Sequence, residues 1–289
     1  MLEKIFIFIL GLGVGSFLNV CIYRMPREQS IRKPSRSFCP NCKKTILWYD
    51  NIPILSFILL KGRCRFCNGK ISLRYPIVEL LSGLLFLMAF SYFGITWELV
   101  IYLIVIGGLI AASFIDIEYQ IIPDEISLGG LVLGLVASLA YPALHNTNLH
   151  LLSLFRSFIG VLVGGGIIYI TGWLGALAFK KEAMGGGDVK LLAMMGAFLG
   201  WQAVLIIFFA APFLATIITL IINTRKIAVE ILKRGNSVIQ GSIFAKIKIM
   251  LKMLLTGTIP YGPFLSIAAV VVLFYKDVII QYFLFMVRY

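Results

Sequence analysis

The chain has 289 residues, of which 60% are hydrophobic and only 13% are charged, and its formal net charge is +13. A soluble domain carries roughly 25% charged and 45–50% apolar residues, so this composition excludes an ordinary soluble fold. The apolar residues form long blocks, which are typical of helices that cross a bilayer, because such a helix needs about 20 apolar residues and pairs its own backbone groups.

Eight apolar blocks are predicted to be transmembrane helices, of which the sixth is short. In chain order they lie near Leu2–Tyr23, Pro76–Ile95, Trp97–Ile115, Ile126–Pro142, Phe155–Phe179, Val189–Leu199, Trp201–Ile222 and Pro263–Val287. The predicted fold class is all-α, a polytopic integral membrane protein with one cytoplasmic loop domain. We expect a first transmembrane helix at 1–23, a four-cysteine region at 24–75 and a membrane-embedded domain at 76–289. The first block lacks a small-residue cleavage site, so no cleavable signal peptide is expected.

The basic residues predict the orientation of the helices. Most of the 26 Lys and Arg residues lie in the segments 24–74, 180–190 and 223–257, and the positive-inside rule places such segments in the cytoplasm. With eight spans, both termini are then outside. Topology and attraction to anionic lipid headgroups explain the net charge, and no nucleic-acid partner is expected. Apolar and lysine residues at helical spacing over 243–254 predict an amphipathic helix on the inner leaflet.

Four of the five cysteines form two closely spaced pairs. They are Cys39-Pro-Asn-Cys42 and Cys64-Arg-Phe-Cys67. Two such pairs can supply the four thiolates of a tetrahedral zinc site, and a cytosolic location disfavours disulfides. We predict structural zinc, because four cysteine ligands leave no open position for catalysis; a redox role is the less favoured alternative. Cys21, in the first span, is expected to be a packing residue.

The first span also contains Gly11 and Gly15 in the string Gly-Leu-Gly-Val-Gly-Ser. A nucleotide-binding loop is one interpretation, but no strand precedes the string and its spacing differs from the dinucleotide-binding fingerprint. Glycines four residues apart in an apolar helix are typical of close helix packing. We therefore favour a packing role.

Two acidic residues lie at the cytoplasmic ends of predicted spans. Asp116 follows the third span, and Asp188 opens the sixth after Gly185-Gly186-Gly187. Acids at the hydrocarbon boundary are costly, which makes them candidates for function. Two adjacent carboxylates share a proton, so one can activate water while the other protonates a scissile amide. The three glycines are expected to allow unusual backbone angles and close approach by a substrate.

An alternative interpretation makes these acids interfacial loop residues. In that case they would pair with Lys180, Lys181 or Lys190. Asp124 and Glu118 lie near Asp116 and are more exposed by position, so for them the two interpretations remain equally open.

The segment Gly185-Gly186-Gly187-Asp188 has the form of a G-x-G-D motif, and it belongs to a series that runs through nearly the whole chain. The other members are Gly15–Val20, Arg24-Met25-Pro26, the two cysteine pairs, Asp50-Asn51-Ile52-Pro53, Arg74–Glu79, Ile115-Asp116, Ile122-Pro123-Asp124 and Pro260–Phe264. In this order the series resembles the type IV prepilin peptidases, a family of G-x-G-D aspartyl membrane proteases that includes bifunctional leader peptidases and N-methyltransferases.

The resemblance implies an enzyme of the bacterial inner membrane whose active site faces the cytoplasm. It would act on type IV prepilins or pseudopilins, cleaving their basic leaders with Asp116 and Asp188 as the catalytic pair. The supporting positions would be Gly185, Gly187, Lys190, Asp124 and Glu79.

The resemblance also implies methylation of the new N-terminus by S-adenosylmethionine. An α-amino group has a pKa near 7.7–8.0, against about 10.4 for lysine, so more of it is neutral and nucleophilic at neutral pH. Glu79 is the best candidate to hold a sulfonium cation, although a counter-charge to Arg74 or Lys70 explains this residue equally well.

Two other classes remain as alternatives. One is a peptidase-only G-x-G-D intramembrane protease, which would lack the four-cysteine region found here. The other is a non-enzymatic membrane assembly factor or transporter, but a transporter places its charges near mid-membrane, whereas these acids lie at one face.

Overall fold

The computed structural model describes residues 1–34, 36–180, 184–234 and 260–288. Within these ranges every one of the eight predicted spans coincides with a long helix. The long helices are α1 (Leu2–Arg24), α3 (Arg74–Phe93), α4 (Trp97–Tyr119), α5 (Asp124–Ala140), α6 (His150–Phe179), α7 (Gly186–Leu199), α8 (Trp201–Arg234) and α10 (Gly262–Arg288). Five of them, α1, α3, α4, α6 and α8, contain an apolar stretch long enough to cross a membrane.

The outer faces of the bundle are apolar. Large hydrophobic side chains stay exposed along several helices, among them Phe6, Leu84, Phe155, Leu162, Ile170 and Phe213. A soluble protein rarely exposes so much contiguous apolar surface, but lipid tails solvate it. With the long apolar helices, this surface makes the chain a multi-pass membrane protein.

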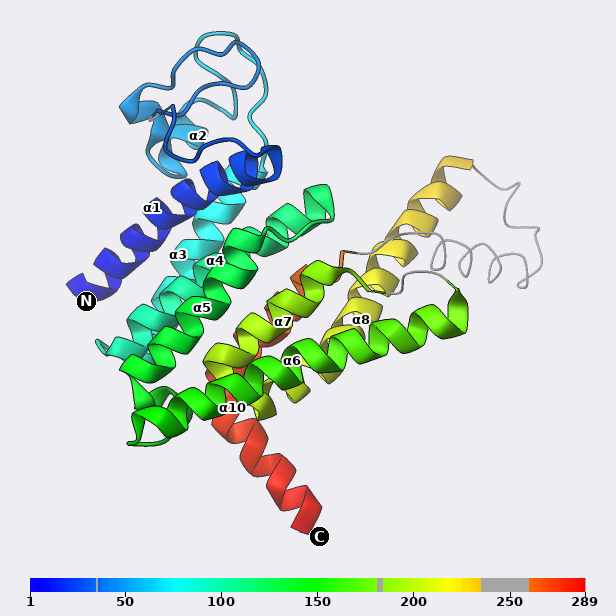
Figure 1. Cartoon of the computed structure of the whole chain (residues 1–289). Helices are drawn as coiled ribbons and strands as arrows, with labels where there is room; N and C mark the ends of the chain where they lie inside the picture. Colours follow the sequence, from blue (N-terminus) through cyan, green and yellow to red (C-terminus); the bar gives the residue numbers. More distant parts are fainter. Residues whose placement is uncertain (35, 181–183, 235–259, 289) are drawn as a thin grey trace.

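Helix α7 lies at the centre of one half of the molecule (Figure 1). It has 14 residues, and every residue from Leu191 to Leu199 is buried. Glycine allows α6 to lie directly against it: a Cβ on Gly164 would come 2.5 Å from the carbonyl oxygen of Leu192. Because protein contacts α7 on all sides, the surroundings of its residues are set by the neighbouring helices and not by the length of α7.

Helices α1 and α3 cross where α1 carries its glycines. A Cβ on Gly11 would lie 2.8 Å from the Cα of Gly83, and one on Gly15 would lie 2.6 Å from the Cα of Glu79. No side chain fits into such gaps, so the predicted packing role of these glycines is confirmed. Cys21 is buried on the same helix.

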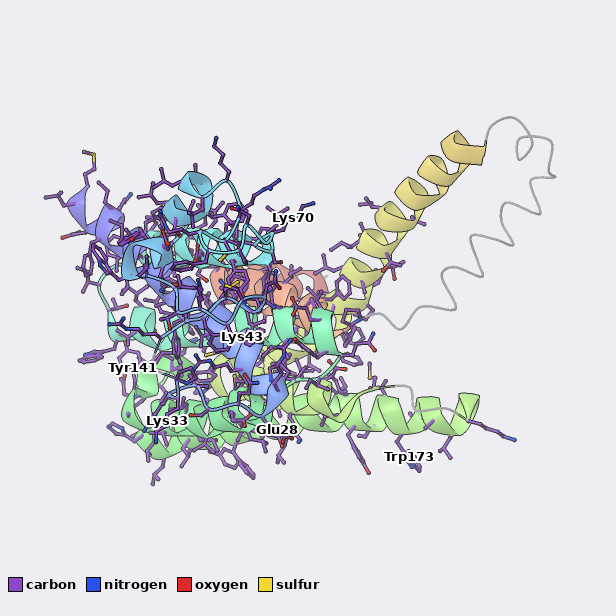
Figure 2. The ribbon with its side chains drawn as sticks, turned by 90° about the horizontal axis from the view of Figure 1, so that it is seen from above. Glu28, Lys33, Lys43, Lys70, Tyr141 and Trp173 are labelled. Carbon is purple, nitrogen blue, oxygen red and sulfur yellow. The ribbon has the colours of Figure 1, made fainter. Side chains whose placement is uncertain are left out.

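The four-cysteine region covers the ends of α1 and α3 (Figure 1). It contains the short helix α2 (Leu55–Leu59) and the single-turn helices η1 (Met25–Arg27) and η2 (Trp48–Asn51). Seen from above, it carries Lys33 and Lys43 on its surface (Figure 2).

Helix α8 differs from its predicted boundary. The seventh predicted span was expected to end at Ile222, but the helix continues to Arg234. The added segment is rich in residues that favour helix, such as Ala, Leu, Glu, Lys and Arg, so a helix continues beyond the apolar stretch without a break. The amphipathic helix predicted at 243–254 lies outside the described residues.

Candidate active site and metal centre

Asp116 lies in the last turn of α4 and is buried, with 6% of its surface exposed. Gln120 ends the helix in the left-handed conformation (φ 55°), and α5 begins four residues later at Asp124. The Oδ2 atom of Asp116 accepts a hydrogen bond from the backbone N–H of Gly262, at 2.9 Å. The start of α10 therefore orients this carboxyl group.

Asp188 lies in the first turn of α7, where its backbone N–H donates to the carbonyl of Gly185 at 3.1 Å. It is half-buried, and the charge of Asp116 acts on its carboxyl group. Ile122 joins the segments around the two acids: a Cβ on Gly187 would lie 3.0 Å from the Cβ of Ile122, and one on Gly262 would lie 3.2 Å from its Cδ1. Three segments distant in sequence thus meet at one place.

The three glycines before Asp188 do not adopt unusual backbone angles. None has a positive φ, and Gly185 has φ −73° and ψ 142°. The expectation of unusual angles is wrong, because close packing and not backbone conformation makes a side chain costly at Gly187. Gly185 and Gly186 are exposed, so the approach to Asp188 on that side is bordered by backbone.

The other acids near the site are held by cations. Lys190 Nζ lies 2.6 Å from Asp124 Oδ1, and Arg74 Nη1 lies 2.6 Å from Glu118 Oε2. Asp124 is exposed, and its partner Lys190 stands on the same helix as Asp188. The geometry distinguishes Asp116, which is buried, from Asp124 and Glu118, which are exposed and paired with cations.

Tyr261 is a site residue that sequence reasoning did not single out. Its hydroxyl is buried and has no hydrogen-bond partner among the described residues. Burial, and then the charge on Asp188, raise the pKa of Tyr261 to about 12. The phenol therefore stays protonated and is available as a donor next to the acids. In the sequence, the one signal for Tyr261 was its place between Pro260 and Gly262, in a segment that carries the family resemblance.

The four paired cysteines come together as predicted. Their Sγ atoms all lie within 4.8 Å of one another, and those of Cys39 and Cys67 are 3.9 Å apart. Tetrahedral zinc with bonds of about 2.3 Å places its sulfur ligands about 3.8 Å apart. The donor set and the spacing fit a metal ion of this kind.

Both cysteine pairs have the same local fold. In each, the backbone N–H after the second cysteine donates to the carbonyl of the first, Lys43 to Cys39 and Asn68 to Cys64, at 2.8 and 2.9 Å. Both donors have a positive φ, 59° and 55°. This repeated turn points two thiols in the same direction, so two copies can face each other.

The long segment between the pairs forms its own structure. Arg65 donates two hydrogen bonds to Asp50, at 2.7 and 2.8 Å, and these bonds lower the pKa of Asp50. The bidentate pair connects η2 to the second cysteine turn.

Glu79 is 7% exposed and lies on α3, one turn after the helix begins at Arg74. Its Oε2 atom accepts a hydrogen bond from the backbone N–H of Ile54 at 2.8 Å, and its carboxyl also bonds Ser16. Arg74 pairs with Glu118, and no cation pairs with Glu79 in the described part of the chain. The counter-charge interpretation of Glu79 is therefore wrong.

Ile54 holds its N–H towards Glu79 in a strained conformation, with φ 61° and ψ −50°. A β-branched residue rarely has a positive φ, and such strain costs about 1–3 kcal/mol. Strained residues concentrate at functional sites, so the strain at Ile54 makes its hydrogen-bond partner Glu79 a candidate for a functional role.

Comparisons with known proteins agree with this arrangement. A model described as the bacterial peptidase A24 N-terminal domain matches residues 9–93, and one described as the type IV leader peptidase family matches residues 102–220. Proteins named prepilin leader peptidase/N-methyltransferase are 32% identical in Stutzerimonas stutzeri, over 93% of this chain and 89% of that protein, and 33% identical in Pseudomonas aeruginosa, over 96% and 91%. A Myxococcus xanthus protein of the same name is 41% identical over 71% of this chain, and the match spans 58% of its length. No solved structure matches the chain.

Proposed function

The chain belongs to the type IV leader peptidase family, and we propose that it is a bifunctional enzyme that cleaves the basic leader of type IV prepilins or pseudopilins and methylates the new N-terminus. The observation that carries the peptidase part is the convergence of the segments of α4 and α7 that carry Asp116 and Asp188, which meet at Ile122 and Gly262. Two carboxylates brought together in this way hold one proton between them.

Cleavage follows from that shared proton. The ionised carboxyl removes a proton from a water molecule, the water oxygen attacks the scissile carbonyl carbon, and the protonated carboxyl donates its proton to the amide nitrogen that leaves. The N–H of Gly262 keeps Asp116 in place during these transfers. The phenol of Tyr261 is a positioning group that donates to Asp188 or to the substrate carbonyl.

The membrane environment suits a substrate that is itself anchored in the bilayer. We place the enzyme in the bacterial inner membrane, with the ends of α4 and α7 that carry the aspartates on the cytoplasmic side. The basic segments 24–74 and 180–190 support this orientation under the positive-inside rule. A membrane-anchored precursor then presents its leader at the same face.

The proposal also assigns a metal ion and a methyl donor. Cys39, Cys42, Cys64 and Cys67 would hold a zinc ion that stabilises the region, and with four thiolate ligands this ion has no open position for substrate. S-adenosylmethionine would supply the methyl group.

Separate Asp116→Asn and Asp188→Asn variants test the dyad on a purified prepilin, with mass spectrometry of the product. Each is expected to lose cleavage by on the order of 10³-fold or more. Asp124→Asn is the comparison, and it should lose less than about tenfold, since only a surface ion pair is removed. Full cleavage by either dyad variant would contradict the assignment.

A further inference from the structure

A cavity of about 380 Å³ lies between α1, α3 and the four-cysteine region. This volume is within the range of roughly 300–1,000 Å³ that is typical of small-molecule sites. Its walls include the aromatic side chains of Tyr23, Phe38 and Tyr75, and the carboxyl-bearing residues Glu79 and Glu118. The catalytic aspartates do not line it, so it is a second site beside the peptidase centre.

Two polar atoms in the walls of this cavity have no hydrogen-bond partner among the described residues. Asn19 is 2% exposed, and its Nδ2 donates to the carbonyls of Gly15 and Tyr75 while its Oδ1 accepts nothing in the described part of the chain. The Nε–H of Arg74 is also buried without an acceptor among the described residues. Buried polar atoms are rarely left in this state, so the cavity offers one acceptor and one donor to a ligand.

The charges around the cavity are unevenly satisfied. The carboxylates of Asp50 and Glu118 are neutralised by Arg65 and Arg74. In the part of the chain that the structure describes, Glu79 has only the N–H of Ile54 and the hydroxyl of Ser16 as partners. Glu79 therefore has room to face a ligand cation. The cationic wall residues are Arg24, Arg27, Lys44, Arg65, Lys70 and Arg74.

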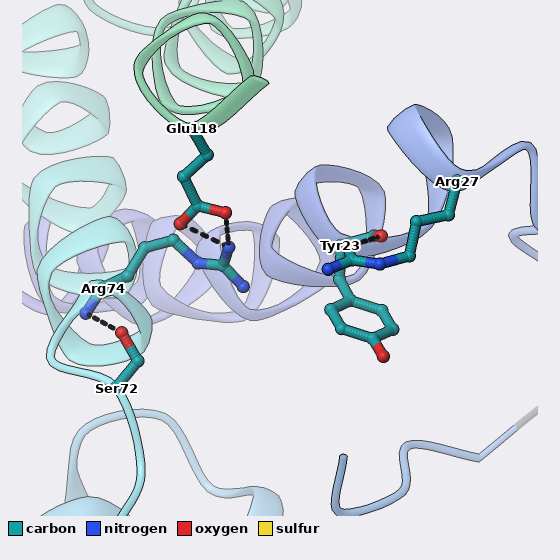
Figure 3. Close-up of polar contacts among 5 residues, drawn as sticks. All are labelled: Tyr23, Arg27, Ser72, Arg74 and Glu118. Carbon is teal, nitrogen blue, oxygen red and sulfur yellow. Dashed lines mark hydrogen bonds and ion pairs between the residues drawn. The ribbon is translucent and has the colours of Figure 1, made fainter.

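Such walls select among possible occupants. Six cations against three carboxylates disfavour a strongly basic leader peptide, and a ligand with both a carboxylate and a buried cation suits them better. Figure 3 shows Arg74 bonded to Glu118, with Arg27 beside Tyr23 on the neighbouring chain segment. The Arg27 guanidinium lies 4.0 Å from the centre of the Tyr23 ring, which leaves an aromatic and a cationic surface on one wall.

We propose that this cavity binds S-adenosylmethionine, with the sulfonium against Glu79 and the amino-acid carboxylate towards the arginines. The inference rests on the proposed function, because it assigns a place to the methyl donor of that function. The unsatisfied Oδ1 of Asn19 accepts from an amino group of the ligand, and the unsatisfied Nε of Arg74 donates to an acceptor of the ligand.

The reaction balances without any further reactant. The lone pair of the neutral α-amino nitrogen forms a bond to the methyl carbon, and the electron pair of the broken S–CH₃ bond stays on sulfur. The resulting ammonium ion can pass its extra proton to water. The positive charge at sulfur disappears in this step. Glu79 therefore binds the donor more strongly than the neutral thioether product, S-adenosylhomocysteine.

Direct binding tests the inference independently of activity. Purified full-length protein in lipid nanodiscs is dialysed against labelled S-adenosylmethionine, with S-adenosylhomocysteine measured by competition. Glu79→Gln should weaken binding of the sulfonium by about tenfold or more, as expected for the loss of a charge-assisted contact, and should weaken binding of the thioether by much less. Glu3→Gln is the matched control, because Glu3 is exposed near the opposite end of α1.

Ultraviolet cross-linking of the labelled donor to the unaltered protein, followed by peptide mass spectrometry, locates the site even if the Glu79 variant does not fold. Labels on peptides that contain Tyr23, Phe38 or Tyr75 support the inference. Three results would each overturn it. The labels could be confined to peptides of α5–α8, Glu79→Gln could bind both ligands as tightly as wild type does, or wild type could fail to bind the donor. Cleavage of a prepilin without S-adenosylmethionine is measured in parallel, and its absence would refute the proposed peptidase while leaving the binding result to be judged alone.

Discussion

Replacing Gly262 by alanine is expected to disable cleavage while leaving most of the stability intact. The added Cβ would lie 2.8 Å from Asp116 Oδ2 and 3.2 Å from Ile122 Cδ1. Ordinary contacts at such atoms begin near 3.4 Å, so the carboxyl must move by roughly 0.6 Å or more. A misplacement of about 1 Å at a reacting group can cost about 10²-fold in rate, and we therefore expect a loss of 10- to 100-fold in kcat.

The stability effect of this substitution is expected to be small. Both contacted atoms are ends of side chains that can rotate, so the overpacking cost is near the lower end of about 1–3 kcal/mol. Alanine also keeps the backbone N–H from which Asp116 accepts its hydrogen bond. Cleavage is followed by mass spectrometry and unfolding by a thermal melt in the same nanodiscs.

Gly129→Ala is the control for this prediction. Gly129 is on α5, and apart from the nearby backbone of its own helix no described atom lies within 4 Å of the position of its Cβ. Alanine should therefore leave cleavage unchanged and slightly stabilise the helix. Full kcat for Gly262→Ala would refute the view that Gly262 sets the position of Asp116. A loss of kcat that only follows a loss of folded protein would refute it as well.

Three further predictions address the other parts of the molecule. Chelation of the metal should weaken S-adenosylmethionine binding more than leader cleavage, because Cys39 and Cys64 line the cavity; equal losses in dialysis and cleavage assays would count against this. Tyr261→Phe should lower kcat about tenfold, or about 1.4 kcal/mol, without moving either limb of the pH–rate profile between pH 5 and 9, because a phenol with a pKa of about 12 stays protonated there; a displaced limb would show that Tyr261 titrates. Gly15→Ala should destabilise the protein by about 1–3 kcal/mol, since its Cβ would lie 2.6 Å from the backbone of Glu79; Gly13→Ala, which has open space around it, should not.

The sequence predicted the helices and the clustering of the four paired cysteines well for a simple reason. Apolar blocks of span length have one stable backbone conformation in lipid, and two Cys-x-x-Cys pairs have few other uses in a reduced compartment. The common side of Asp116 and Asp188 followed from counting spans between them. None of these predictions required knowledge of which helix contacts which.

The pairing of charges could not be predicted in the same way. One interpretation left open by the sequence made Glu79 a counter-charge to Arg74 or Lys70, but Arg74 pairs with Glu118, 44 residues away. Lys190 pairs with Asp124 across 66 residues. In a membrane helix nearly every face is apolar, so periodicity does not reveal the face that packs. The backbone N–H of Ile54 and the hydroxyl of Tyr261 were missed for that reason.

The last turn of α4 separates the two proposed activities. Residues two apart in a helix point to nearly opposite sides, about 160° apart, since each residue turns the helix by about 100°. Asp116 accordingly faces Gly262 of α10, whereas Glu118 faces Arg74 of α3 and the second cavity. A new N-terminus released at Asp116 has only to pass around a helix about 10 Å wide to reach the methyl donor. The two sites are therefore close enough to act in sequence and separate enough that Asp116→Asn should leave S-adenosylmethionine binding unchanged.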